Sequence, residues 1–248
     1  MIKKFITLFK LGRKIASSDI LEIVSKFQKP PLPITLLFKL LSISFSPKKK
    51  DSNKSEGERL SYSLESMGTT FIKLGQFLAT RPDIIGEKLS KQLENLQDRL
   101  PPFSLLQAKE IIKNDLGQET YDSIINLSEP VAAASIAQVH KAQINDNGVL
   151  KDVAIKILRP NIKKIFNEEI DAIMLFAFLI ESFIKKTKRL KLVEVVFLLK
   201  EITNLEMDLR FEAAAANEYA ENTKNDVGFR VPQIYWNYTS ENVMTLDW

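Results

Sequence analysis

The sequence feature that most constrains the fold is a run of small residues followed by a hairpin pattern. Val131 to Val139 reads VAAASIAQV, and Lys156 lies 17 residues further on, within VAIK. Between them, QVHKAQI and DVAIKIL flank the turn sequence NDNG at residues 145–148, which predicts two antiparallel strands joined by a tight turn. We therefore expect a small antiparallel sheet with Lys156 on a central strand.

The small-residue run matches a phosphate-binding loop in which alanines replace the glycines. The protein-kinase pattern G-x-G-x-x-G-x-V places a flexible loop over the phosphates of ATP, and a later strand supplies a lysine to them. Ala132, Ala134 and Ala137 occupy the glycine positions, and Val139 is retained. A Cβ atom excludes most conformations with positive φ, so a nucleotide bound here should be held differently. The alternative is a small-residue packing strand next to a strand with a solvated lysine.

Two further motifs make this pattern specific. In chain order the three motifs are KxGQ at Lys73-Leu74-Gly75-Gln76, AAAS at Ala132-Ala133-Ala134-Ser135 and ExD at Glu206-Met207-Asp208. Together they resemble the UbiB family of atypical kinases, over residues 60–248. The resemblance implies an α+β fold, in which a kinase-like N-lobe of small antiparallel sheet and helices follows a helical KxGQ extension, with the C-lobe absent.

The resemblance also implies a site for ATP or ADP with Mg²⁺. The implied nucleotide-binding residues are Ala132, Ala133, Ala134, Ser135, Ala137 and Lys156. Glu206 and Asp208 would meet the KxGQ helix, which implies a contact with Lys73. The metal ligands are expected from the absent C-lobe, and this chain supplies no catalytic residue of its own.

The residues around the ExD motif indicate an ion pair without reference to the family. Residues 198–223 read as one helix, on which Asp208 and Glu212 lie four residues apart and repel each other. They favour cations opposite them, and a kinase fold pairs its strand lysine with a helix glutamate, so we assign Glu212 to Lys156.

Two features of this helix leave alternatives open. An intrahelical pair with Arg210 is the alternative for Glu206. The alanines at 213–216 indicate either close packing on the sheet or high helix propensity.

The KxGQ motif is expected on a helix whose apolar residues form one stripe. The stripe consists of Leu60, Leu64, Met67, Phe71, Leu74 and Leu78. Lys73 and Gln76 lie on the opposite face, where ordinary solvent exposure is the alternative to a binding role. Gly75 favours close approach of another backbone or a ligand, because a glycine within a helix costs about 1 kcal/mol relative to alanine.

Other segments read as supporting elements. Residues 165–186 predict an extra helix, whose uncharged run at 172–180 is too short for a membrane span of about 20 residues. Ser104 and Gln107 form a capping box that begins a helix, and Gly117 is its expected end. Residues 230–248 predict two strands around the turn TSEN.

The distribution of charge and the content of histidine and cysteine bear on the possible partners, metal sites and cellular location. Residues 1–54 hold 12 of the 35 basic residues and 3 of the 31 acidic ones, so the positive charge belongs to the N-terminus. Residues 1–47 could lie on an anionic membrane surface or dock on the helical domain, and no nucleic-acid motif is present. The one histidine, His140, has no neighbouring cluster that would make a metal or catalytic site. The absence of cysteine suits a cytoplasmic protein, or one peripheral on the inner face of a membrane.

We expect three segments: a basic amphipathic segment with a linker at 1–54, the helical KxGQ extension at 55–125, and the N-lobe with inserted helices at 126–248. The leading hypothesis is a UbiB-family atypical kinase or ATPase that supports the biosynthesis of ubiquinone, a quinone lipid. The alternative is a non-catalytic remnant or regulatory module that binds a partner through the missing C-lobe surface. A third hypothesis keeps the activity but divides it between two chains, of which a separate one supplies the C-lobe. The expected partners are such a chain or other quinone-biosynthesis proteins.

Overall fold

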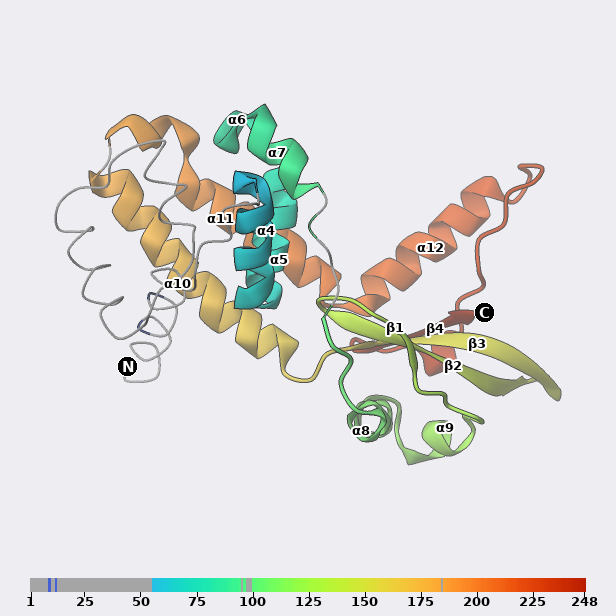
Figure 1. Cartoon of the computed structure of the whole chain (residues 1–248). Coiled ribbons are helices and arrows are strands. Elements are labelled where there is room, and N and C mark those ends of the chain that lie inside the picture. The colour runs from blue at the N-terminus through green and yellow to red at the C-terminus, as the bar shows by residue number, and fades with distance from the viewer. Residues whose placement is uncertain (1–8, 10–11, 13–54, 95, 97–99, 184) are drawn as a thin grey trace. The chain divides into compact units, whose positions relative to one another are not determined.

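The computed structural model describes residues 9, 12, 55–94, 96, 100–183 and 185–248 (Figure 1). Its contacts divide the chain into two compact units. Unit 1 comprises Met1–Asp98 and Lys164–Glu201, and unit 2 comprises Arg99–Lys163 and Ile202–Trp248. The expected segments at 1–54, 55–125 and 126–248 stay a prediction, and the basic N-terminal segment lies outside the described residues.

Unit 1 is helical where it is described. Its elements are α4 (Glu56–Met67), α5 (Thr69–Ala79), α6 (Pro82–Ile85), α7 (Glu87–Leu93), most of α10 (Ile162–Phe183), the 3-10 turn η1 (Lys185–Leu190) and most of α11 (Leu192–Glu206). The extra helix expected at 165–186 is α10, shifted by three residues toward the N-terminus. No helix in the described part of the chain is long and apolar enough to cross a membrane.

The apolar stripe around the KxGQ motif is divided between two helices. Gly68 separates α4 from α5. Its φ is 102°, a backbone conformation that residues with a Cβ rarely adopt. The expectation of one continuous helix was therefore wrong. The stripe still forms a core, because Leu64, Met67 and Phe71 on either side of the break are all buried.

Unit 2 is built around a four-stranded antiparallel sheet with strand order β1-β2-β3-β4. Its strands are β1 (Pro130–Ala133), β2 (Ala137–Asp146), β3 (Val149–Leu158) and β4 (Val243–Asp247), and its helices are α8 (Leu105–Leu116), α9 (Gln118–Asp122), α12 (Leu209–Thr223) and the 3-10 turn η2 (Trp236–Tyr238). Figure 1 shows α8 and α9 on one side of the sheet and α12 on the other. This confirms the expected fold class of helices and a small antiparallel sheet.

The β2–β3 hairpin forms as the sequence predicts. Asn147 and Gly148 both take positive φ, 53° and 86°, which is the two-residue turn that matches the twist of a hairpin. Because side chains alternate along β3, Val153, Ile155 and Ile157 form one fully buried face, packed against α8. The opposite face carries Lys156, and β3 lies between β2 and β4, as expected of a central strand.

The two ends of α8 also agree with the sequence. Ser104 and Gln107 form the capping box, and the helix ends at Gly117, whose amide donates to the carbonyl of Lys113. The expectation of two C-terminal strands was wrong. Only β4 forms, and Ile234 makes a single bridge to Leu246 before the chain turns into η2.

Candidate functional site

Four residues line up across the sheet on the face opposite to α8. Ala132 of β1 lies opposite Val139 of β2, which lies opposite Lys156 of β3, which lies opposite Met244 of β4. Residues directly opposite in an antiparallel sheet point to the same face. The row therefore joins the alanine loop, the retained valine and the strand lysine on one surface.

Lys156 has Glu212 as its partner on this surface. Its Nζ donates to both carboxylate oxygens of Glu212, each at 2.7 Å. The two side chains are 24% and 49% exposed, so solvent reaches the pair. The structure thus brings together the two residues that the sequence assigns to each other, although they are 56 positions apart.

The helix that carries Glu212 begins later than expected. Instead of one helix over residues 198–223, α11 ends at Glu206 and α12 begins at Leu209. Asp208 is the N-cap of α12, where its Oδ1 accepts from the amide of Arg210 at 3.1 Å. An aspartate in this position satisfies an amide that the helix leaves unpaired, so a new helix begins here.

Asp208 also binds the side chain of the residue that it caps. The Arg210 guanidinium donates to both of its carboxylate oxygens, at 2.9 and 2.6 Å. This contact holds the pKa of Asp208 below its ordinary value. Arg210, considered as a partner for Glu206, therefore pairs with Asp208.

The first turn of α12 is fixed to the loop that leads into β4. The amide of Leu209 donates to the carbonyl of Glu241 at 3.0 Å, and Leu209 and Ala213 are fully buried. The three alanines that follow, at 214–216, are exposed or half-buried. Their presence is explained by helix propensity rather than by packing on the sheet.

Lys163 extends the charged surface near the start of α12, and the sequence gives no signal for it. Its ammonium pairs with the carboxylate of Glu241. Asp208 lies near enough to interact electrostatically with this ammonium. Burial lowers the pKa of Lys163. The ExD aspartate thus lies beside two cations of its own unit, Lys163 and Arg210.

The alanine loop has the backbone that its composition predicts. None of residues 131–137 takes up a positive φ. The amide of Ala134 donates to the carbonyl of Ala137 at 2.8 Å, which closes the turn between β1 and β2. Ala132 is exposed, Ala133 and Ala134 are half-buried, and Ser135 and Ala137 are buried. The alanine side chains, and not the serine hydroxyl, therefore form the outer surface of this loop.

The KxGQ residues lie in unit 1. Lys73 and Gln76 are half-buried on α5, and Gly75 is buried. A Cβ at Gly75 would lie 2.6 Å from Cδ2 of Leu96 and 2.8 Å from Cδ1 of Leu64, so apolar side chains occupy this space. We had expected a backbone or a ligand there. Glu206 and Asp208 belong to unit 2, and their contact with Lys73 stays a prediction.

His140 is a buried structural residue. The side-chain amide of Gln138 donates to Nε2 of His140 at 2.8 Å, so Nε2 is the acceptor. The ring proton therefore lies on Nδ1, which donates to the carbonyl of Ser128. Burial lowers the pKa of His140, which keeps the ring neutral. The described residues contain no group of three histidine or acidic side chains that could hold a metal ion.

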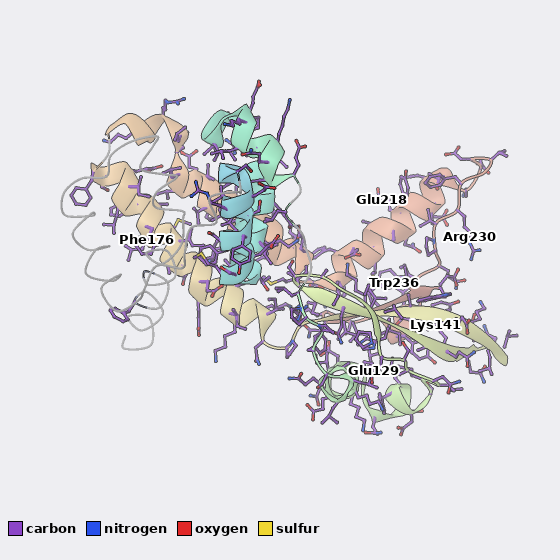
Figure 2. All side chains as sticks on the ribbon, viewed as in Figure 1. Glu129, Lys141, Phe176, Glu218, Arg230 and Trp236 are labelled. Carbon is purple, nitrogen blue, oxygen red and sulfur yellow. The ribbon has the colours of Figure 1, made fainter. Side chains whose placement is uncertain are left out.

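A hollow of about 500 Å³ lies at the other end of the hairpin. It is lined by α9, by the β2–β3 turn at 145–147 and by residues 233–238, among which Trp236 is labelled in Figure 2. The alanine loop joins β2 at Ala137, nine residues before Asp146 at the turn end. This hollow is therefore separate from the row that contains Lys156.

Comparison with known proteins defines the class. The family model of the ABC1 atypical kinase-like domain matches residues 95–248, and the chain belongs to this family. Among curated relatives, "Probable protein kinase UbiB" of Marinobacter nauticus is 37% identical over 218 residues, which are 88% of this chain and 39% of the relative. The protein of the same name from Azotobacter vinelandii is 35% identical over 89% of this chain and 41% of the relative. That from Tolumonas auensis is 31% identical over 100% of this chain and 44% of the relative. The chain thus spans about 40% of the length of these relatives, and the UbiB resemblance is confirmed.

Proposed function

We propose that unit 2 binds ATP or ADP on the sheet face that carries Lys156. The observation that supports this most directly is the row of Ala132, Val139, Lys156 and Met244, with Glu212 bound to the lysine. The base would lie on the apolar part of this face, and the phosphates would lie between the alanine loop and the ammonium group. Membership of the ABC1 atypical kinase-like family supports the same ligand.

In this proposal the chain's own residues bind and orient the nucleotide. The Lys156 ammonium supplies a positive charge to the phosphates, and Glu212 keeps that ammonium on the open face. The alanine loop approaches from one side, with Ala132 exposed and Ala133 and Ala134 half-buried. It has no positive-φ residue, so its backbone is less adaptable than that of a glycine loop. Mg²⁺ would supply charge neutralisation at the phosphates, and we expect its ligands from the C-lobe of a kinase-like fold.

We further propose that the whole protein is an atypical kinase or ATPase that supports ubiquinone biosynthesis. The UbiB names of the relatives and the three ordered motifs support this role.

The proposal places the protein in the cytoplasm or at the inner face of a membrane, which residues 1–47 would contact. Sedimentation of the chain with anionic but not neutral vesicles, lost when the lysines of 1–47 are changed to glutamine, would support that contact, and equal sedimentation would contradict it.

The nucleotide site is tested by the affinity of the 248-residue chain for ADP, measured calorimetrically. Lys156→Met should weaken binding by about tenfold or more, because a hydrogen bond to a charged group contributes about 1.5–3 kcal/mol. Lys151→Met is a matched control on the same strand. Lys151 makes an ion pair with Asp146 at the same 2.7 Å, but it lies at the hairpin end of β3. Equal losses in the two variants, or none in either, would contradict the proposed site.

A second candidate is a non-catalytic remnant or regulatory module that binds a partner through the surface that a C-lobe would cover. The outer side of α12 favours it, because Phe211 and Tyr219 are 57% and 53% exposed. Large apolar side chains grouped on one helix are typical of an interface. The native mass of the protein isolated from its source decides the matter. A single chain of 28.3 kDa supports this candidate. A longer species, or a complex with a chain that carries the catalytic-loop residues, contradicts it and favours the kinase or ATPase.

A further inference from the structure

Arg159, three residues after Lys156, makes hydrogen bonds that no motif predicts. Its Nε and Nη2 donate to the carbonyl of Ala134 at 3.0 and 2.8 Å. Its Nη1 donates to the carbonyl of Pro101 at 2.9 Å, and Nη2 also reaches that of Leu100 at 3.2 Å. One guanidinium thus joins the alanine loop to a segment that precedes α8.

The main chain of Arg159 holds the same loop. Its amide donates to the carbonyl of Ile136 at 2.8 Å, next to the Ala134–Ala137 hydrogen bond that closes the turn. The end of β3 therefore fixes the loop through both main chain and side chain. A loop that is held on this side has fewer conformations to lose when a ligand binds.

The segment Leu100–Phe103, which we term the strap, is also held by Gln138, whose side chain is buried. Gln138, only 1% exposed, accepts from the amide of Phe103 at 2.9 Å and donates to its carbonyl at 3.2 Å. The Arg159 guanidinium lies over the ring of Phe103, 6.0 Å from its centroid. The strap is therefore seated across the base of the loop by Arg159 and Gln138 together.

We propose that Arg159 is a positioning residue that couples the strap to the alanine loop, so that the loop keeps its ordered conformation only while the strap is seated. Calling this loop the nucleotide loop rests on the proposed function. The coupling itself rests on the shared guanidinium, whose donors are divided between the two segments. Release of the strap removes one set of acceptors, and release of the loop removes the other, so each segment stabilises its partner.

Lysine cannot replace this arginine. A guanidinium presents five N–H donors in a rigid planar fork, whereas an ammonium presents its donors from a single point. Arg159→Lys keeps the charge but should release the strap from the loop. Arg230→Lys is the matched control, because Arg230 is an exposed arginine of the same unit that pairs with the carboxylate of Asp247.

The test is amide hydrogen exchange in the whole chain, followed by NMR without nucleotide. In Arg159→Lys, the amides of Ala134 and Phe103 should both exchange about tenfold faster or more, because local opening replaces their protected state. The amides of Ile155 and Ile157 in the sheet should exchange as in the wild type, which shows that the fold is intact. Arg230→Lys should change none of the four.

A second variant tests the coupling from the side of the strap. Phe103→Ala removes the ring over the guanidinium and should speed exchange at Ala134, which Phe103 does not bond. Unchanged exchange at Ala134 in a folded Arg159→Lys or Phe103→Ala chain would overturn the proposal.

ADP affinity separates this proposal from the proposed function. A wild-type chain that binds no ADP contradicts the nucleotide site, while the exchange rates still decide the coupling. If the wild type binds ADP, Arg159→Lys should weaken the affinity by the same factor by which it lowers the fraction of molecules whose loop is ordered. Faster exchange at Ala134 with unchanged ADP affinity would overturn the role of Arg159 in nucleotide binding.

Discussion

The helices α8 and α12 cover opposite faces of one sheet, and different interactions hold them there. α8 buries Ala108 and Ile112 completely in the core. The buried residues of α12 are Leu209 and Ala213, both near its start, and an exposed ion pair connects it to β3. Burial of an apolar side chain contributes about 1.5–3 kcal/mol, whereas an exposed ion pair contributes about 0–1 kcal/mol. Each helix thus buries one large aliphatic residue and one alanine. α8 also packs Ile111 and Leu116 against the core, whereas α12 adds the ion pair, which places a carboxylate beside Lys156.

The largest expected effect comes from the core of α8. Ile112→Ala should lower the free energy of unfolding by about 2–5 kcal/mol, because it leaves a cavity at a fully buried position. Phe211→Ala on α12, where the ring is 57% exposed, should change it by less than about 0.5 kcal/mol. Urea denaturation followed by circular dichroism measures both, and similar losses would remove the distinction between the helices.

The next effect concerns the end of α8, where Asp115 binds the loop before β4. Its carboxylate accepts from the Ser240 hydroxyl and from both the main-chain and side-chain amides of Asn242. Asp115→Ala should cost about 1–3 kcal/mol of unfolding free energy, because these donors lose their acceptor. Asp115→Asn keeps one acceptor oxygen and should cost less in the same denaturation experiment. Equal costs would show that the hydrogen bonds are not the cause.

At the start of α12, Asp208→Ala should cost about 1 kcal/mol through loss of the N-cap. The folded-state pKa of Asp208 lies below its ordinary 3.8, chiefly because of the Arg210 hydrogen bond. The contribution of the carboxylate is therefore fully present above pH 3.8 and is lost as the pH falls through the lowered value.

Asp208→Asn separates the cap from the charge. Asparagine caps helices about as well as aspartate, so this variant should keep most of the stability at neutral pH and lose the acid dependence. Denaturation at a series of pH values measures both variants. An acid dependence that persists in Asp208→Asn would assign it to another carboxylate.

The smallest effect on stability is expected at the ion pair itself. Glu212→Gln should change the free energy of unfolding by less than about 1 kcal/mol, because both partners are reached by solvent. ADP affinity should fall several-fold, because Lys156 loses the group that orients it. Calorimetry and denaturation on one preparation compare the two effects. A stability loss above about 3 kcal/mol with unchanged affinity would show that the pair behaves as a buried structural bridge.

The sheet and the Lys156–Glu212 pair could be predicted because their signals are local or follow a known spacing. Alternating apolar residues around Asn147 and Gly148 define the hairpin, and the strand register then follows. The position of Lys156 on the central strand, and Glu212 as its partner, came from the kinase-like motif. The structure places them within hydrogen-bonding distance.

Helix boundaries and Arg159 could not be predicted in this way. The apolar period continues across Gly68 and across Asp208, so periodicity alone does not show where one helix ends and the next begins. The acceptors of Arg159 are main-chain carbonyls, 25 and 58 residues earlier in the chain, and any residue type supplies such a carbonyl. No pattern of side chains therefore marks this contact in the sequence.

The break between α11 and α12 has a consequence for tolerance to insertions. In a continuous helix, one added residue rotates everything after it by about 100°, which would turn Glu212 away from Lys156. Here the first amide of α12 is bound by the carbonyl of Glu241 rather than by a carbonyl of α11. The orientation of Glu212 is thus set by the loop before β4, and one residue added within α11 should not by itself turn Glu212 away from Lys156.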